Sequence, residues 1–342
     1  MGFNFYMPVQ IISGQGVVRQ HGKTIAGLGR RCLIVTDAAV AKASGALQDI
    51  EKIAEEYGIA CQVYDKVQPN PAVGDCWECG RQAAGFGAEF LIGIGGGSPM
   101  DAAKAAAVFA ANPGMRPMDI FDKKSVPSLP TVLLGTTAGT GSEVSCYCIL
   151  TDENGKKKNC GIPAMFAKYA FGDINYMKSL PYAVTVGTAL DAVTHAMEGY
   201  FNKNADDFSD RLALDAMRVL VPGLEALRTR PEVIPLSLRQ QLYEGSIYGG
   251  MVLGIASTVF GHKMGYYLSE AFHVPHGFAC AVFLPELFRL AQTEMPDKLQ
   301  ALCNELGYTD SYLVQLFRDL TKADIPPIPE ATLDFLIESW RG

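Results

Sequence analysis

Long apolar runs and an excess of basic residues are both missing from this chain. No apolar run reaches the roughly 18–20 residues that a membrane-spanning helix needs, and the N-terminus lacks the basic and apolar regions of a signal peptide. The formal net charge is −7, with no basic stripe to neutralise phosphates. Neither nucleic acid nor an anionic membrane surface is therefore expected as a partner, and we predict a cytoplasmic protein.

Closely spaced pairs of cysteines are also few. The nine cysteines are odd in number and scattered along the chain, which excludes a secreted disulfide scaffold and favours reduced thiols. Cys76 and Cys79 have the C-x-x-C spacing of a redox or zinc motif, but no second such pair accompanies them. Because residues three apart share one face of a helix, we interpret these two thiols as structural neighbours.

The pattern of apolar residues changes near residue 180. Before it, short apolar runs at 31–37, 60–64, 89–94 and 131–134 alternate with helical patterns at 45–57 and 73–86, which is typical of βαβ units in a doubly wound sheet. After it, strand-like alternation is nearly absent. The expected helices cover residues 181–201, 207–228, 236–250, 252–270, 278–292, 296–306 and 310–322. We predict an α/β Rossmann-like domain over 1–180 and an all-α domain over 181–342.

A glycine-rich loop follows the strand expected at 89–94. Three consecutive glycines, residues 95–97, let a ligand approach the backbone, and the N-terminus of the next helix offers N–H groups to a pyrophosphate. Ser98 is expected as the N-cap of this helix, with Asp101 at N3 in a pattern that resembles a capping box. The alternative is a purely structural turn.

A second loop, residues 136–143 (TTAGTGSE), follows the strand at 131–134. Its hydroxyl groups and glycines suit ribose, phosphate or nicotinamide, and two such loops favour a dinucleotide over a mononucleotide. Asp37 ends the strand that begins at Arg31. Its carboxylate can accept hydrogen bonds from an adenosine ribose and repel a 2′-phosphate, which favours NAD over NADP. An N-cap or loop role is the alternative for Asp37.

Three of only five histidines combine with one aspartate in a pattern that suits a divalent metal. Asp191 and His195 lie one turn apart on an apolar helix, where an unpaired carboxylate is costly. His262 is on a later helix, and His276 lies in a turn expected at 272–277. One carboxylate oxygen and three imidazole nitrogens form a four-ligand set for Fe²⁺ or Zn²⁺. For Asp191 and His195 alone, a simple hydrogen bond is the alternative.

Five ordered motifs stand out together: residues 68–71 (QPNP), 95–101 (GGGSPMD), 136–143 (TTAGTGSE), 191–195 (DAVTH) and 275–277 (PHG). With these motifs, the chain resembles the iron-dependent (group III) alcohol dehydrogenase family from about residue 3 to residue 290. The resemblance implies a nucleotide-binding N-terminal domain, a helical C-terminal domain and a cleft between them.

The resemblance also implies site residues. Asp191, His195, His262 and His276 match the family's metal ligands, with Fe²⁺ as the expected ion and Zn²⁺ as the alternative. NAD is the expected cofactor, and NADP is the alternative. The residues implied to line the cofactor are Asp37, Asn70, Gly95, Gly96, Gly97, Ser98, Asp101, Thr136, Thr137, Thr140, Ser142 and Lys158.

Two departures from the family concern activity. The family commonly places a histidine four residues after the third ligand to relay the alcohol proton, and this chain has Tyr266 there. With an ordinary pKa of about 10, a tyrosine suits this task less well than a histidine at neutral pH. We expect the relay to use Tyr266, a water molecule or His273, which is otherwise a surface residue. The chain also ends before the family's last segment, so part of the cleft wall is expected to be absent or to come from a partner subunit.

The expected function is reversible hydride transfer between a small primary alcohol or aldehyde and NAD(H), by a metal-dependent alcohol dehydrogenase that forms a homodimer or a larger oligomer. One alternative is a glycerol dehydrogenase-like or dehydroquinate synthase-like enzyme on the same fold, where one Asp and two His commonly bind the metal. The other is a non-catalytic relative that binds nucleotide, which Tyr266 and the short C-terminus favour.

Overall fold

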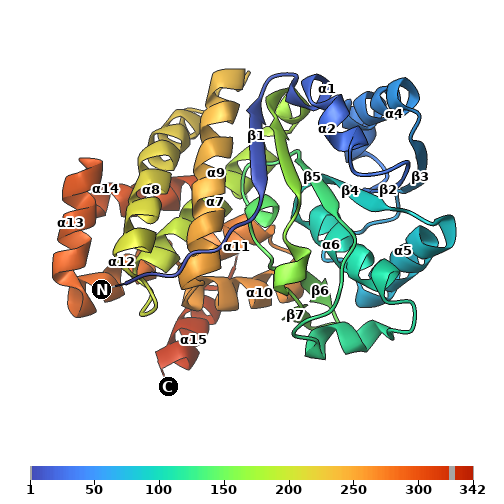
Figure 1. Ribbon diagram of the computed structural model, residues 1–342. Helices are drawn as coiled ribbons and strands as arrows, with labels where there is room; N and C mark the ends of the chain where they lie inside the picture. Colours follow the sequence, from blue (N-terminus) through green and yellow to red (C-terminus); the bar gives the residue numbers. More distant parts are fainter. Residues whose placement is uncertain (1, 323–327, 342) are drawn as a thin grey trace. The chain divides into compact units, whose positions relative to one another are not determined.

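The computed structural model describes residues 2–322 and 328–341 and divides the chain into two compact units (Figure 1). The α/β unit comprises Tyr6–Thr137 and Ser142–Ser179. The helical unit comprises Met1–Phe5, Ala138–Gly141 and Leu180–Gly342. The predicted fold class, an α/β Rossmann-like part followed by an all-α part, is confirmed. Among the described residues, no helix combines the length and apolar character that crossing a bilayer requires.

A six-stranded parallel sheet forms the centre of the α/β unit, in the order β1-β8-β5-β4-β2-β3. Its strands are β1 (Gln10–Gly14), β2 (Arg31–Val35), β3 (Ala60–Tyr64), β4 (Phe90–Gly95), β5 (Thr131–Gly135) and β8 (Tyr169–Asp173). A separate antiparallel pair consists of β6 (Ile149–Thr151) and β7 (Lys157–Asn159). The four predicted strands are present as β2 to β5. β1 and β8 are additional strands, and they pair with each other across more than 150 residues of chain.

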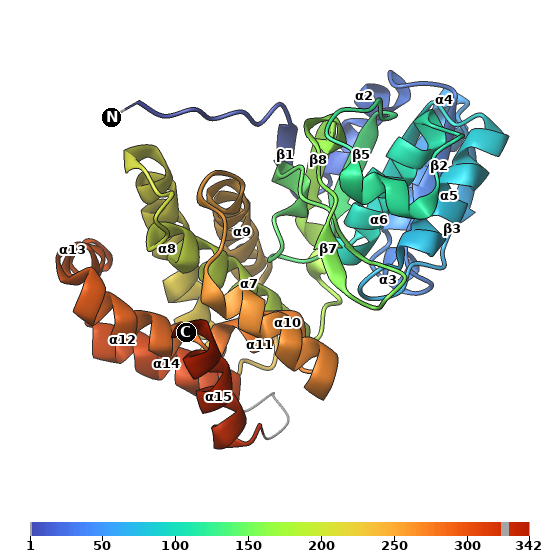
Figure 2. The ribbon, with the colours of Figure 1, turned by 90° about the horizontal axis from the view of Figure 1, so that it is seen from below.

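The central strands β2, β4 and β5 bury both faces because their side chains alternate between two cores. Leu33 and Val35 of β2 pack with residues of α5 (Val73–Phe86) and α6 (Gly97–Ala111). Cys32 and Ile34 pack instead with short helices on the opposite face. Figure 2 shows helices on both sides of the sheet. The helices of the opposite face are α1 (Val17–Gln20), α2 (Gly22–Ala26), α3 (Val40–Ala43) and α4 (Ala46–Tyr57).

Four short 3-10 helices complete the α/β unit: η1 (Pro117–Asp122), η2 (Ser142–Val144), η3 (Pro163–Met165) and η4 (Ile174–Met177). The Cys76 and Cys79 thiols, one turn apart on α5, are both buried in the core between α5, α6 and the sheet. This placement agrees with their interpretation as structural neighbours.

Helix α7 (Tyr182–Tyr200) is the central element of the helical unit. Its residues from Ala189 to Tyr200 are all buried, because α7 packs against α8, α9 and α11. The helices of this unit are α8 (Asp207–Arg228), α9 (Leu236–Ala256), α10 (Phe260–Phe272), α11 (His276–Ala281), α12 (Leu284–Glu294), α13 (Pro296–Leu306), α14 (Asp310–Lys322) and α15 (Glu330–Arg341). Small side chains such as alanine on α7 allow this close packing of helices.

Three predicted element boundaries in this unit are wrong. The helices expected at 236–250 and 252–270 are α9 and α10, and the break comes later because Ser257 has a left-handed φ of 65°. The single helix expected at 278–292 is divided into α11 and α12. The turn expected at 272–277 is shorter, since Pro275 is the N-cap of α11 and His276 is its first residue.

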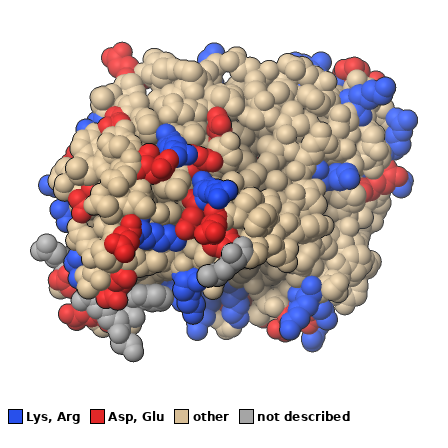
Figure 3. All heavy atoms as spheres, turned by 60° about the vertical axis from the view of Figure 1, so that its left-hand side comes forward, with Lys and Arg blue, Asp and Glu red and all other residues tan. Residues whose placement is uncertain are grey.

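Charges of both signs occur side by side on the face drawn in Figure 3, which shows Lys and Arg next to Asp and Glu. Arg218 of α8, for example, pairs with Asp215 one turn earlier and with Glu305 of α13. These exposed pairs are screened by water, so each contributes little to stability.

The packing of α5 on α6 yields a stability prediction. A Cβ atom on Gly80 would collide with Phe109 and lie 2.9 Å from the carbonyl oxygen of Ala106, whereas nothing lies within 4 Å of one on Gly85. We expect Gly80→Ala to lower the free energy of unfolding by about 1–3 kcal/mol through overpacking. The matched control Gly85→Ala, on the same helix, should raise it by about 0.5–1 kcal/mol. Thermal unfolding measures the free-energy change of both variants. Equal changes for the two variants would contradict the close contact of Gly80 with α6.

Candidate metal centre and nucleotide loops

Three helices bring the predicted metal ligands together. Asp191 and His195 are on α7, His262 is on α10, and His276 begins α11. A Cβ atom on Gly277 would collide with the backbone of Gly187 and lie 3.1 Å from Cβ of Asp191. The first turn of α11 therefore rests directly on α7 beside the Asp191 carboxylate, and this approach requires glycine at position 277.

The Asp191 carboxylate lies close to all three histidine rings. Oδ1 of Asp191 lies 3.9 Å from Nε2 of His195, 3.5 Å from Nε2 of His262 and 3.7 Å from Nε2 of His276. In a tetrahedral site with bonds of about 2.0 Å, neighbouring donors are about 3.3 Å apart. The observed spacing is therefore close to what a divalent ion needs. That these residues bind a metal remains a prediction that the geometry permits.

Two donor atoms at this centre are buried without a partner. Asp191 is 3% exposed and His262 is 4% exposed, and among the described residues Oδ1 of Asp191 and Nε2 of His262 make no hydrogen bond. Buried polar atoms normally have partners because their desolvation is costly. A cation between them would satisfy both atoms, so the centre fits a metal ion.

The protonation states of Asp191 and His195 suit metal binding. Burial alone raises the pKa of the Asp191 carboxyl, but the adjacent His195 and His276 rings outweigh burial and hold this pKa below its usual range. Burial lowers the pKa of His195 to about 4, despite the nearby Asp191. At neutral pH, Asp191 is therefore a carboxylate and His195 a neutral imidazole, which are the forms that bind metals.

Glu198 fixes the orientation of His262. Its carboxylate accepts a hydrogen bond of 2.6 Å from Nδ1 of His262 and two more from the backbone N–H groups of Val259 and His262. With its proton on Nδ1, the ring presents the lone pair of Nε2 to Asp191. The sequence analysis missed Glu198. The available signal was a carboxylate three residues after His195 in an apolar helix, where it shares a face with the expected ligands.

The two expected proton-relay residues have different surroundings. The Tyr266 ring stacks on the His276 ring, with centroids 5.4 Å apart and an interplanar angle of 10°. His273 is exposed and forms the C-cap of α10 in a left-handed conformation, with φ 55°. Tyr266 is thus in contact with a metal-ligand candidate, and the position of His273 agrees with its alternative interpretation as a surface residue.

The first glycine loop differs from the prediction in the residue that forms the N-cap of helix α6. Helix α6 begins at Gly97 with Gly96 as its N-cap, and no side chain caps it, so the prediction of Ser98 as N-cap is wrong. Oγ of Ser98 instead accepts a hydrogen bond of 3.2 Å from the backbone N–H of Asn70. Gly95 has φ +148°, and a Cβ atom there would lie 2.6 Å from Pro99. The N–H groups that open α6 are therefore not used by a capping side chain and suit an anion.

Buried polar residues join the two loops. Asp101 accepts hydrogen bonds from Oγ of Ser142, at 2.6 Å, and from the backbone N–H of Ile149, at 2.9 Å. The fully buried Lys104 donates to Oγ of Ser142 at 2.7 Å and to the carbonyl of Tyr147 at 2.9 Å. Asp101 and Ser142 thus hold the second loop against α6, which is a positioning role that their sequence motifs did not reveal.

The remaining hydroxyl groups of the second loop lie close to the first. The backbone N–H of Thr136 donates to the carbonyl of Gly95 at 2.9 Å, and its buried Oγ1 has no partner among the described residues. A Cβ atom on Gly96 would lie 3.3 Å from Oγ1 of Thr137. Thr140 belongs to the segment that groups with the helical unit. The structure thus places Thr136 and Thr137 beside the glycine loop.

Asp37 and Lys158 both have partners within the protein. Oδ1 of Asp37 accepts hydrogen bonds from the backbone N–H groups of Ala39 and Val40, as in the loop alternative, since the N-cap of α3 is Ala39. Lys158, on β7, pairs with Asp152 at 2.7 Å. A role in nucleotide binding requires Asp37 to use its other carboxylate oxygen, and it remains a prediction for both residues.

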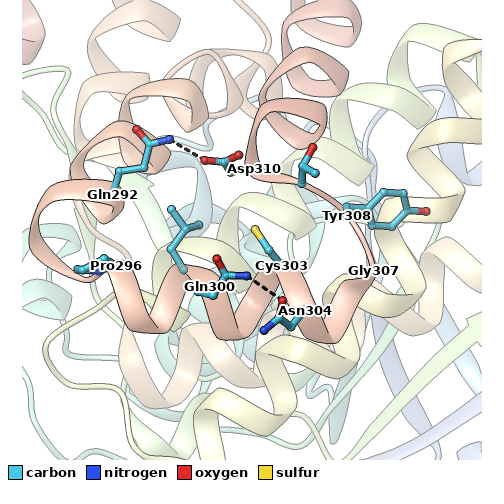
Figure 4. A pocket seen from close by; sticks show the side chains of 10 residues that line it. Gln292, Pro296, Gln300, Cys303, Asn304, Gly307, Tyr308 and Asp310 are labelled. Atoms are coloured by element: carbon cyan, nitrogen blue, oxygen red, sulfur yellow. Dashed lines mark hydrogen bonds between the residues drawn. The ribbon is translucent and has the colours of Figure 1, made fainter.

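A pocket of about 580 Å³ lies among α12, α13 and α14 (Figure 4). Gln292 donates a hydrogen bond of 2.6 Å to Asp310 at its edge, and Cys303 and Tyr308 line it. None of the predicted site residues lines this pocket. It is therefore separate from the residues that the motifs single out.

The role of Glu198 can be measured. We expect Glu198→Gln to lower the affinity for a divalent metal by about 10–100-fold, because the neutral amide no longer holds the Nδ1–H tautomer of His262 as strongly. Competition with a chromogenic chelator gives the affinity. The exposed Glu244 of α9 provides a matched control, since Glu244→Gln should leave the affinity unchanged. An equal loss in both variants would contradict the specific role of Glu198.

Comparisons with known proteins identify the family of this chain. The family model "Iron-containing alcohol dehydrogenase" matches residues 8–174, and "Fe-containing alcohol dehydrogenase family, C-terminal" matches residues 185–322. The sulfoacetaldehyde reductase of Bilophila wadsworthia is 32% identical over 290 residues, which cover 83% of this chain and 74% of the relative. The lactaldehyde reductase of Escherichia coli is 29% identical, covering 81% of this chain and 72% of the relative.

Solved structures agree as well. An iron-containing alcohol dehydrogenase from Thermotoga maritima has a TM-score of 0.88 and 32% identity, and the match covers 99% of this chain and 92% of that one. The sulfoacetaldehyde reductase of Bifidobacterium kashiwanohense, solved in complex with NAD⁺, has a TM-score of 0.88 and 25% identity, with 100% and 93% covered. The predicted family is confirmed: this chain belongs to the iron-containing alcohol dehydrogenases, a family of oxidoreductases.

Proposed function

We propose that this chain is a metal-dependent alcohol dehydrogenase that transfers hydride reversibly between a small primary alcohol or aldehyde and NAD(H). The observation that carries the proposal is the buried Oδ1 of Asp191, which lies within 4 Å of three imidazole nitrogens. A divalent ion held by Asp191, His195, His262 and His276, Fe²⁺ or Zn²⁺, supplies Lewis-acid polarisation of the substrate oxygen when bound.

The surrounding residues organise this centre. Glu198 orients the His262 ring, and the low pKa of His195 keeps its ring neutral. Tyr266, stacked on His276, is our proposed proton carrier, because a phenol can donate and accept a proton at its Oη. His273 is the second candidate for this step. The apolar residues of α7 keep water from the buried side of the donors.

The nucleotide is proposed to bind at the two loops of the α/β unit. The uncapped N-terminus of α6 and the flexible glycines before it suit the pyrophosphate, and Thr136 and Thr137 lie beside them. Support for NAD comes from the Bifidobacterium kashiwanohense structure solved with NAD⁺. The names of two relatives, sulfoacetaldehyde reductase and lactaldehyde reductase, support short aldehydes that carry a polar group as the substrate class.

Substitution of His276 tests the proposal. Anaerobically purified protein should contain one divalent metal and oxidise NADH with short aldehydes. In His276→Ala, we expect kcat/KM to fall by at least about 100-fold and metal content to drop, because one donor is lost. Elemental analysis and NADH absorbance measure these quantities. His21→Ala, at the junction of α1 and α2 in the other unit, is the matched control and should retain both.

The outcomes separate the rival functions. If His276→Ala keeps both metal and turnover, the ligand assignment is wrong. Metal-loaded wild-type protein that binds NADH but reduces no short aldehyde would favour a non-catalytic relative. A lyase of the dehydroquinate synthase type would show no steady change in NADH absorbance with simple alcohols or aldehydes.

The choice between NAD and NADP yields a separate prediction for Asp37. We expect Asp37→Asn to raise the ratio of kcat/KM for NADPH to that for NADH by about tenfold or more, because the negative charge that repels a 2′-phosphate is removed. Asparagine keeps an oxygen for the N–H groups of Ala39 and Val40, so the local turn is preserved. Asp65→Asn, directly after the neighbouring strand β3, is the control. An unchanged ratio in Asp37→Asn would exclude Asp37 from the ribose site.

A further inference from the structure

A thiol lies among the metal-ligand candidates. Cys280 follows His276 by one turn on α11, and its Sγ lies 3.6 Å from Nδ1 and 3.8 Å from Nε2 of that histidine. Asp191, His262, His276 and Cys280 each offer one donor atom, and these four atoms all lie within 4.8 Å of one another. No motif in the sequence pointed to Cys280, because the expected four-ligand set was complete without it.

The thiol is held in place by close packing. Cys280 is fully buried, and a Cβ atom on Gly265 would lie 2.7 Å from its Sγ. Helix α10 therefore approaches the sulfur at a point where it carries no side chain. A thiol in this position has little freedom to turn away from the donors, and it is shielded from solvent.

Two observations show that an ion would fit this set of donors. Oδ1 of Asp191 and Nε2 of His262 belong to side chains more than nine-tenths buried, and neither atom has a hydrogen-bond partner in the described part of the chain. The spacing of the sulfur is also compatible: metal–sulfur and metal–nitrogen bonds of about 2.3 and 2.0 Å at a tetrahedral angle place the two donors about 3.5 Å apart, and Sγ lies 3.8 Å from Nε2 of His276, the nitrogen that faces Asp191.

His195 lies beside a different part of this cluster. Its ring stacks on the His262 ring, with centroids 4.5 Å apart, and it is not among the four residues whose donor atoms are mutually within 4.8 Å. The centre therefore offers five donors, of which one is sulfur. Zinc accepts four ligands in most sites and five in some catalytic states, so His195 and Cys280 need not exclude each other.

Resting on the metal-dependent function proposed above, we propose that Cys280 is itself a metal ligand beside Asp191, His262 and His276, and that its sulfur shifts the preference of the centre from Fe²⁺ toward Zn²⁺. When the ion binds, the S–H bond breaks, the proton leaves to solvent and a sulfur–metal bond forms. A thiolate is a softer donor than carboxylate or imidazole, and it shifts the preference toward zinc and away from harder ions such as Mn²⁺.

X-ray absorption at the zinc edge tests this proposal on the full chain loaded with one equivalent of Zn²⁺. We expect one sulfur neighbour at about 2.3 Å beside nitrogen and oxygen neighbours at about 2.0–2.1 Å. In Cys280→Ser, the sulfur neighbour should disappear, and the affinity for Zn²⁺ should fall by about tenfold or more while that for Mn²⁺ changes little. The matched control is Cys303→Ser on α13, which should retain the sulfur neighbour.

The wild-type spectrum decides the proposal even if Cys280→Ser does not fold. A zinc ion surrounded only by nitrogen and oxygen would overturn the role of Cys280 and leave the proposed dehydrogenase function intact. Retention of the sulfur neighbour in Cys280→Ser would likewise overturn it. A wild-type protein that binds neither Zn²⁺ nor Fe²⁺ would contradict the proposed function and the thiolate ligand together.

Discussion

The buried carboxylate of Asp191 is the constraint on which the helical unit depends. A carboxylate 3% exposed is costly unless positive charge or hydrogen-bond donors surround it. The chain meets this cost by bringing α7, α10 and α11 to one point, and glycines make the approach possible. Gly277 lets α11 rest on α7, and a side chain at Gly261 would collide with the carboxylate of Glu198. Helix packing and site geometry are thus consequences of the same requirement.

The α/β unit also contains a buried charge that needs partners, in this case a cation. Lys104 is fully buried, and its ammonium group is satisfied by Ser142, the carbonyl of Tyr147 and the nearby Asp101. Because these partners come from the second loop, from the segment that follows it and from α6, a single buried cation holds the hydroxyl-rich loop against the helix that follows the glycine loop. In both units, therefore, an expensive buried charge determines the position of chemically useful groups.

The sequence predicts those features that arise from local patterns. The strands β2 to β5, the helices α13 and α14, and the pairing of Asp191 with His195 on one helix all follow from periodicity over a few residues. β1 and β8 did not, because no local pattern marks the pairing of β1 with β8, which joins segments more than 150 residues apart in the chain. The late break at Ser257 depends on a backbone conformation that no residue type there demands.

The residues of the candidate site likewise divide into those that local sequence patterns predict and those that depend on distant contacts. The motifs identified the histidines, but not Glu198 or Cys280, since a carboxylate and a thiol in apolar helices have many ordinary roles. Ser98 was assigned to a cap because its neighbours resemble a capping box, yet Asp101 is turned inward to Ser142 and Ile149. Tertiary hydrogen bonds, which sequence spacing does not encode, decided between the two arrangements.

The three hydrogen bonds of Glu198 have a consequence for how the helical unit assembles. Its carboxylate, fixed on α7, accepts from the backbone N–H groups of Val259 and His262 at the very start of α10 and from the His262 ring. The start of α10 is therefore anchored through the same histidine that faces the donor cluster. An ion that bound only this arrangement would favour the folded protein by mass action, and the affinity for the ion and the stability of the helical unit would then be thermodynamically linked.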